Sequence, residues 1–400
     1  MSRLMTPDAG SPMDDVQGAF LRQMLSSFGA FGDVLDTLLP YTLNPFDVAR
    51  FDVSSLPLAD ELHIEAWEDY VQESRRDGVW PVLARRLVQF RFPIAAGVSR
   101  TDAYRAATRR GVLPPVNWPG FTLEDPGALE LELHPTLAGR VPVITCGTRA
   151  DFVALVRACS CRNEPEPVPD SMGACIVTGL NNWDRVARLR RRLEEERGGP
   201  FDENGWAEAL RGLKPQKALY QDRVIILSRE PYSGVPAAAF GLDDGLWRVR
   251  SVAIRRAHEC THYFTLRAFG MMRNNLLDEL VADFAGLVHT YHRYDAGMAL
   301  RFLGLESYPG YRAGGRFENY LKTPPIGSEA AAILGGIVVR AARAVETVSA
   351  GLDLAVPSAC GRMVLALAGS TLVELAGDEA EARLRVRLSS ASGARLETGP

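Results

Sequence analysis

Two histidines four residues apart, with a glutamate directly after the first, form the most informative pattern in this chain. They are His258, Glu259 and His262, in the order H-E-x-x-H. On an α-helix, residues four positions apart lie on one face, so both imidazoles can reach a single metal ion. Imidazole nitrogens are common zinc ligands, and a neighbouring carboxylate can accept a proton from water that zinc has acidified. The pattern therefore predicts a zinc site with Glu259 as the general base.

The residues around this pattern are those of two successive helices. Residues 251–268 contain neither proline nor glycine, and Gly270 follows as a helix stop. A second helix is predicted over residues 275–292, and Asn274 or Asn275 would serve as its N-terminal cap. The two helices would therefore be joined by only a few residues.

Two acids on one face of the second helix provide the remaining groups of the predicted site. A carboxylate on an apolar helix is costly to bury unless it is paired or binds a metal. Glu279 would be the third protein ligand and would leave a fourth position for water. Asp283, one turn later, would accept a hydrogen bond from a ligand histidine. Asp278 is an alternative third ligand. The alternative for Glu279 and Asp283 is that both are charges facing solvent.

Gly286 lies on the same side of the helix as Glu279 and would allow a neighbouring helix to approach closely.

The H-E-x-x-H pattern followed by a helix with E-x-x-x-D resembles the gluzincins, the zinc metallopeptidase group that includes thermolysin and related aminopeptidases. The resemblance covers residues 251–293. It implies one Zn²⁺ and an α/β fold of the α+β type, in which a zincin-like mixed sheet precedes the active-site helices and a helical C-terminal half. The residues carried over are His258, His262 and Glu279 as zinc ligands, Glu259 as general base and Asp283 as the partner of a ligand histidine.

A zinc hydrolase also needs a hydrogen-bond donor for the developing oxyanion, often Tyr, His or Arg. Five candidates lie downstream of the third ligand: His289, His292, Tyr308, Tyr311 and Tyr320. His289 is the first choice, although it lies nearly three helical turns beyond Glu279. A structural role is the alternative for each of the five.

The composition is that of a globular protein with a small net charge. The chain has 400 residues, of which 46% are apolar and 24% charged, and its formal net charge is −4. This balance gives no reason to expect nucleic acid as a partner. No apolar run approaches the ~18 residues needed to span a bilayer, and the N-terminus does not have the pattern of a secretory signal. Six cysteines are too sparse for a disulfide framework. We therefore expect a cytoplasmic protein with free thiols and no membrane partner.

Three regions are predicted along the chain. Residues 1–135 would form a mostly helical N-terminal region whose first ~15 residues are loose. Residues 136–295 would form the zincin-like catalytic unit. Residues 296–400 would form a helical C-terminal region, which contains apolar helices at 329–349 and 358–376.

Strand-like and helix-like segments alternate before the metal-binding helices. Strands are predicted at 141–146, 175–178 and 224–228, and helices at 149–159 and 183–197. This order indicates a β-sheet with helices packed on it. In the gluzincin resemblance an edge strand upstream of the metal helix binds peptides by strand addition. Residues 224–228 are the candidate, and a central core strand is the alternative.

Residues 163–174 contain three alternating prolines, which stiffen an extended segment. Together with residues 181–185 they resemble a sequence block of an uncharacterised bacterial protein family. The segment would be a lid or wall over the metal, or a rigid surface loop that enters a strand.

The predicted reaction is hydrolysis of an amide or peptide bond in a peptide or a small-molecule amide substrate. The chain lacks the aminopeptidase substrate motif G-x-M-E-N, which leaves two alternatives. One is a zinc-dependent small-molecule tailoring enzyme that performs a non-hydrolytic condensation, elimination or rearrangement. The other is a zincin scaffold that binds a partner without catalysis.

Overall fold

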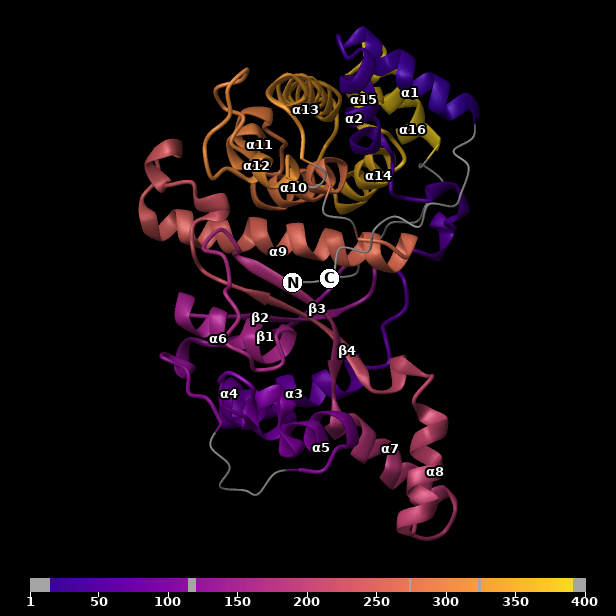
Figure 1. The fold of residues 1–400 in the computed structure, drawn as a ribbon, viewed down its shortest axis with the longest axis vertical. Coiled ribbons are helices and arrows are strands. Elements are labelled where there is room, and N and C mark those ends of the chain that lie inside the picture. The colour runs from indigo at the N-terminus through magenta and orange to yellow at the C-terminus, as the bar shows by residue number, and fades with distance from the viewer. Residues whose placement is uncertain (1–14, 114–119, 273–274, 323–324, 391–400) are drawn as a thin grey trace. The chain divides into compact units, whose positions relative to one another are not determined.

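The computed structural model combines helices with a small mixed sheet, so the predicted α+β fold class is confirmed (Figure 1). It describes residues 15–113, 120–272, 275–322 and 325–390. The predicted loose N-terminal residues up to 14 lie outside the described residues. The chain divides into two compact units. The first unit consists of residues 1–58, 136–138 and 231–400, and the second of residues 59–135 and 139–230. The segment 136–295, predicted as a single catalytic unit, is thus shared between them.

The second unit contains a four-stranded sheet. Its strands are β1 (Glu130–His134), β2 (Val141–Thr145), β3 (Ala174–Asn181) and β4 (Gln221–Leu227). The strand order is β1-β2-β4-β3. β2 and β4 are parallel, and the two outer pairs are antiparallel. Because β2 and β3 pair with both edges of β4, the prediction of an edge strand at 224–228 is wrong and the central-strand alternative is confirmed.

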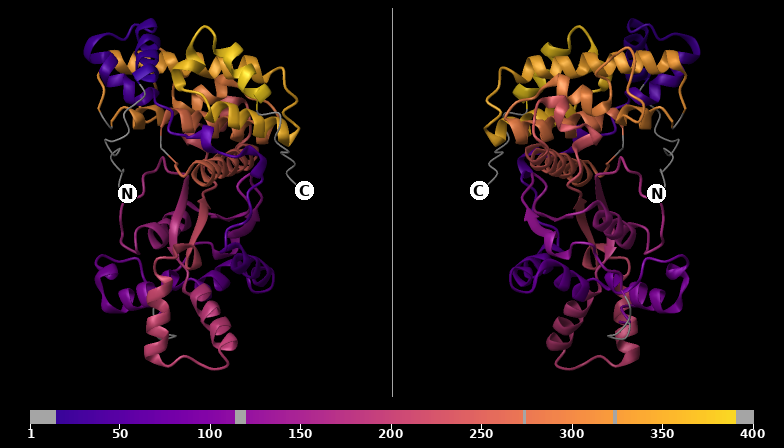
Figure 2. Two further views of the ribbon diagram at one scale, coloured as in Figure 1. Left: turned by 90° about the vertical axis from the view of Figure 1, so that its right-hand side faces the viewer. Right: turned by 90° about the vertical axis from the view of Figure 1, so that its left-hand side faces the viewer.

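Helices surround the sheet core of the second unit. They are α3 (Ile64–Asp77), α4 (Val79–Arg86), α5 (Asp102–Arg110), α6 (Arg149–Ser160), α7 (Trp183–Glu196) and α8 (Glu203–Leu213), with the 3₁₀ helices η3 (Val88–Arg91), η4 (Val98–Arg100), η5 (Pro126–Ala128) and η6 (Lys217–Leu219). Trp67, Phe152 and the inward residues of β2 and β4 form the core. Figure 2 shows α7 and α8 as a helical hairpin directed away from the sheet. The proline-rich residues before β3 form a loop that enters this strand.

The first unit consists of helices in its described part. They are α1 (Asp15–Ser27), α2 (Gly32–Thr42), α9 (Asp244–Phe269), α10 (Leu276–Tyr291), α11 (Ala296–Leu303), α12 (Arg316–Tyr320), α13 (Ser328–Ser349), α14 (Pro357–Ala368), α15 (Leu372–Ala376) and α16 (Ala380–Ser390), with the 3₁₀ helices η1 (Val48–Arg50), η2 (Val53–Ser55), η7 (Tyr232–Gly234) and η8 (Ala237–Phe240). Extensive contacts join α9 to α10 and α13 to α15.

The helices predicted around the H-E-x-x-H pattern are confirmed as α9 and α10. The side chain of Asp243 caps the first turn of α9, which begins seven residues earlier than predicted. α9 ends at Gly270, whose positive φ of 69° suits a residue without a side chain. The side chain of Asn275 caps α10 by accepting a hydrogen bond from the backbone of Asp278 at 2.8 Å. Both helix ends therefore have local sequence causes.

Gly286 allows α9 and α10 to pack closely, as predicted. A Cβ atom on this residue would lie 2.9 Å from the backbone oxygen of Ile254 and 3.0 Å from its Cγ2. Such contacts are too short for a side chain. The absence of a side chain at Gly286 therefore sets how near the two helices lie.

Candidate metal centre

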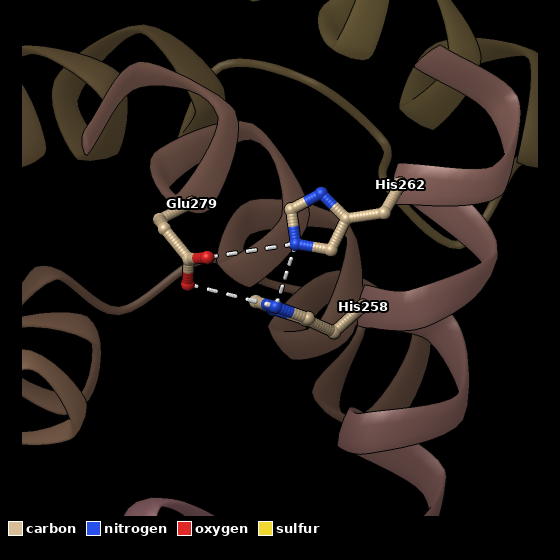
Figure 3. A group of neighbouring side chains, drawn as sticks. All are labelled: His258, His262 and Glu279. Carbon is tan, nitrogen blue, oxygen red and sulfur yellow. Dashed lines mark hydrogen bonds and ion pairs between the residues drawn. The ribbon is translucent and has the colours of Figure 1, made fainter. Parts of the chain in front are cut away.

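The two histidines and Glu279 converge in the first unit from neighbouring helices. His258 and His262 project from the same face of α9, and Glu279 projects toward them from the first turn of α10 (Figure 3). The three residues are buried, with relative exposures of 5%, 6% and 7%. One ligand atom of each residue lies within 4.8 Å of the other two. The three residues that the sequence analysis selected as ligands therefore lie together in the structure.

The donor atoms have the spacing that a single small cation requires. The two Nε2 atoms are 3.0 Å apart. Oε2 of Glu279 lies 3.7 Å from Nε2 of His258, and Oε1 lies 3.6 Å from Nε2 of His262. Donors bound to one tetrahedral zinc at its usual bond lengths are separated by about 3.3 Å. Two nitrogens and one oxygen at this spacing fit a divalent metal of the zinc type.

Asp283 lies behind His258, on the side of the ring opposite the predicted metal. Its Oδ1 is 3.0 Å from Nδ1 of His258. The hydroxyl of Tyr232 donates to the same oxygen at 2.7 Å and lies 2.8 Å from Nδ1. An acceptor at this position favours the tautomer with hydrogen on Nδ1, which leaves Nε2 of His258 free to bind a metal. Asp283 therefore stands where the sequence places the partner of a ligand histidine.

Asp278 has the corresponding place behind His262. Its Oδ1 lies 3.1 Å from Nδ1 of His262, within ion-pair distance, although the angle is not that of a regular hydrogen bond. The hydroxyl of Thr265 approaches the same oxygen at 3.4 Å. Because Asp278 faces the outward nitrogen, the geometry favours Glu279 over Asp278 as the third ligand.

Two residues of α12 contact the carboxylate of Glu279. Nη2 of Arg316 lies 2.8 Å from Oε2 of Glu279 and donates to Oδ2 of Asp283 at 2.7 Å. Nη1 of Arg316 donates to the hydroxyl of Tyr232 at 2.9 Å. The phenol of Tyr320 also hydrogen-bonds Glu279. A single arginine thus connects the predicted third ligand with the group behind His258.

Burial and opposite charge act against each other on the acids of this cluster. Burial is the largest single influence and would raise the pKa values of Glu279 and Asp283, but Arg316 and the neighbouring histidines together outweigh it and hold the pKa of each below its usual range. Both groups therefore remain ionised in the interior of the protein.

The pKa values of His262 and of the phenols of Tyr232 and Tyr320 are also shifted by burial and by the neighbouring carboxylates. Burial alone would lower the pKa of His262, but Asp278 and Glu279 raise it well above its ordinary value. Burial, and then the charge of Asp283, raises the pKa of Tyr232. Burial, and then the charge of Glu279, raises the pKa of Tyr320. The phenols therefore keep their protons and act as hydrogen-bond donors.

The charges of the cluster also fit a divalent cation. Glu279, Asp283 and Asp278 supply three carboxylates, and Arg316 supplies one positive charge. With neutral histidines, a divalent cation would make the buried group electrically neutral. Since uncompensated buried charge is strongly unfavourable, neutrality supports a divalent metal.

Glu259 is adjacent to the ligand group without being part of it. It follows His258 on α9 and is partly exposed, whereas the three converging side chains are buried. Its carboxylate forms no hydrogen bond or ion pair with any residue that the structure describes. The carboxylate is therefore available for proton transfer.

The first-choice oxyanion donor, His289, does not lie at this group. It is exposed near the C-terminal end of α10, and ten residues of helix separate it from Glu279 by about 15 Å. His292, Tyr308 and Tyr311 are also exposed. Tyr320 is buried and contacts Glu279, so it is the candidate among the five that lies at this group. The sequence argument considered direction around the helix but gave too little weight to distance along it.

Tyr232 and Arg316 were absent from the sequence-based list. Tyr232 belongs to the short helix η7 before α9, and Arg316 begins α12. Arg316 and Tyr320 are one turn apart on this helix, so they project together. The only local signal was an ionic and an aromatic side chain four residues apart, directly after a glycine pair.

The buried His-His-Glu group on two adjacent helices, in a chain that also contains a small mixed sheet, characterises this protein. Residues 23–379 match a family of unknown function (DUF7005), and the chain belongs to this family. Neither a curated protein nor a solved structure matches it.

No helix in the described ranges combines the length and the apolar character needed to cross a membrane.

Proposed function

We propose that this protein is a zinc-dependent hydrolase of amide or peptide bonds, with a metal centre of the gluzincin type. His258, His262 and Glu279 would hold one Zn²⁺. The observation that carries this proposal is the convergence of their donor atoms from α9 and α10, with Glu259 directly beside them and paired with none of the described residues. The nitrogen and oxygen donor set supports zinc over the harder cations, which prefer oxygen alone.

A zinc ion in this position would acidify water and polarise the carbonyl group of the substrate. Glu259 would accept the proton from water and deliver it to the leaving amine. A carboxylate can do this when no other hydrogen bond or ion pair occupies it. Asp283 and Tyr232 would keep His258 in the ligand tautomer. Tyr320, whose protonated phenol hydrogen-bonds Glu279 in the structure, would turn its single O–H from that carboxylate to the developing oxyanion, in place of His289.

We propose a peptide or a small-molecule amide as the substrate and the cytoplasm as the compartment. None of the six cysteines, all of which lie in the described residues, forms a disulfide bond, which suits a reducing environment.

Replacing Glu259 with glutamine tests the proposal because it removes the base without removing a ligand. The zinc-loaded protein and the Glu259→Gln variant would be incubated with a peptide library, and products would be measured by mass spectrometry. We expect turnover to fall by about 10²–10⁴-fold, while the zinc content stays unchanged. Glu208→Gln, an exposed change on α8, is the matched control and should retain full turnover.

Undiminished turnover in Glu259→Gln would contradict the assigned base. Intact peptides after incubation with the unaltered, zinc-loaded protein would instead favour non-hydrolytic chemistry on a small molecule. Zinc content is measured in the same samples, so both outcomes are interpreted for protein that has bound zinc.

A further inference from the structure

We propose that Arg316 is a positioning residue of the metal centre, which restricts Glu279 to binding the metal through one oxygen. This inference rests on the proposed metal centre and concerns how its third ligand is held. By occupying one carboxylate oxygen, Arg316 would keep the number of protein donors at three and leave further positions for water and substrate.

The two oxygens of Glu279 have different surroundings. Oε2 lies 2.8 Å from Nη2 of Arg316, so a charge-assisted hydrogen bond holds it. Each oxygen faces one histidine: Oε1 lies 3.6 Å from Nε2 of His262, and Oε2 lies 3.7 Å from Nε2 of His258, so the contact with Arg316 is what distinguishes them. A metal bound to Oε2 would lie within about 5 Å of the guanidinium, where two positive charges repel each other strongly in a buried site. A metal would therefore bind Oε1.

Arg316 itself is held from several sides and cannot easily give way. Nη2 bridges Glu279 and Asp283, at 2.8 and 2.7 Å. Nη1 donates to the hydroxyl of Tyr232 and to Oδ1 of Asp283, at 2.9 and 3.2 Å. The guanidinium carbon also lies 5.5 Å from the ring centre of Tyr232. A planar fork of donors makes such a bridge, whereas an ammonium group cannot.

The arrangement also explains why an arginine is placed against a predicted metal ligand. A cation beside a ligand carboxylate weakens the ligand as a charge, so a role in affinity alone would not favour it. A free carboxylate can bind zinc through both oxygens and fill a position that catalysis needs. By holding Oε2 of Glu279, Arg316 would prevent binding through both oxygens, and the metal affinity would be somewhat lower.

The test uses Co²⁺ in place of zinc, because its visible absorption reports coordination number. Four-coordinate Co²⁺ absorbs strongly, and higher coordination weakens and shifts the bands. The unaltered full-length protein, Arg316→Met and Arg316→Lys would be loaded with Co²⁺, and bound metal would be counted. We expect strong bands in the unaltered protein and weaker, shifted bands per bound Co²⁺ in Arg316→Met. Arg316→Lys, which retains the charge but loses the fork, should shift in the same direction and supplies the answer if Arg316→Met does not fold.

Arg312→Met is the matched control. Arg312 lies in the same segment, where it donates to Glu306 and to the backbone of Arg301, both at 2.8 Å. The Co²⁺ spectrum of the Arg312→Met variant should equal that of the unaltered protein.

Unchanged spectra in the Arg316 variants, with full Co²⁺ loading, would overturn the role of Arg316 and leave the metal centre intact. A folded variant that no longer binds Co²⁺ would also overturn it, because Arg316 would then be needed for binding itself. Failure of the unaltered protein to bind either Co²⁺ or Zn²⁺ would refute the proposed function, and this result is distinct from the other two.

Discussion

Each of the two converging histidines has a carboxylate on its outward side. Asp283 stands behind His258 and Asp278 behind His262, at 3.0 and 3.1 Å from Nδ1. A carboxylate in this position orients the ring and raises the basicity of the nitrogen that faces the metal. The pair of acids therefore accounts for the direction of both Nε2 atoms, toward each other and toward Glu279.

The raised pKa of His262 predicts how metal affinity depends on pH. In the metal-free protein, the protonated ring stabilises the fold fully below its unfolded pKa of about 6.5, and this contribution is lost as pH rises through the higher folded pKa. At neutral pH a proton must leave His262 before the nitrogen binds a metal. We expect Zn²⁺ affinity, measured by chelator competition, to increase about tenfold per pH unit near neutrality.

The variant Asp278→Asn tests the cause of this slope. It removes the charge that contributes most to raising the pKa of His262, so less proton release should accompany binding. Its slope near neutrality should be shallower. An identical slope in the variant would show that Asp278 does not control the proton on His262.

At the residue scale, local spacing was sufficient for part of the site. The periodicity of a helix placed His258 with His262 and Glu279 with Asp283. It could not place Tyr232 or Arg316, because their positions depend on how separate segments fold back onto α9 and α10. The choice of His289 failed for a related reason, since a short separation in sequence is still a long distance on a straight helix.

At the element scale, the packing of α9 against α10 brings the ligands together. His258 and His262 belong to one helix and Glu279 to the other. Their convergence therefore depends on the interhelical distance, which Gly286 keeps short at Ile254, one turn before His258.

The variant Gly286→Ala should both destabilise the protein and weaken metal binding. The added Cβ would meet the backbone oxygen of Ile254 at 2.9 Å, so α10 must move away from α9. We expect a loss of about 1–3 kcal/mol in the free energy of unfolding, although alanine favours helix by ~1 kcal/mol. Urea denaturation and chelator competition measure the two effects.

Gly212→Ala on α8 is the control, because a Cβ at Gly212 would meet no atom within 4 Å. It should be neutral or stabilising. If Gly286→Ala behaved like this control, close packing at Gly286 would not position the ligands.

Element boundaries show where sequence patterns were sufficient and where they failed. The caps at Asn275 and Gly270 were readable because each acts within its own helix turn. The apolar run at 358–376 was predicted as one helix but forms α14 and α15. Thr371 and Glu374 make a capping box that begins a new helix, and this local signal was present in the sequence. β1 was missed because its alternating Glu and Leu residues have no strong strand preference.

At the scale of the whole molecule, the family match extends over both compact units, whereas the candidate metal centre lies in the first alone. The sheet that the sequence placed with the metal helices belongs to the second unit. Chain order alone did not reveal this division, because it depends on contacts between residues far apart in sequence.

Metal removal should loosen the first unit selectively. A ligand that binds only the folded state stabilises it, by about 2.7 kcal/mol at 100 times its dissociation constant. We expect a chelator to increase amide hydrogen exchange in α9, α10 and α12, and to leave the strands of the second unit protected. An equal increase in β2 and β4 would argue against a metal site confined to the first unit.

The most direct measurement is the metal content of the purified protein by plasma mass spectrometry, alongside a variant that lacks both His258 and His262. The account predicts about one zinc per chain in the unaltered protein and almost none in the folded His258→Ala/His262→Ala variant. Equal metal content in the two proteins, or no divalent metal in the unaltered protein after incubation with zinc, would contradict it.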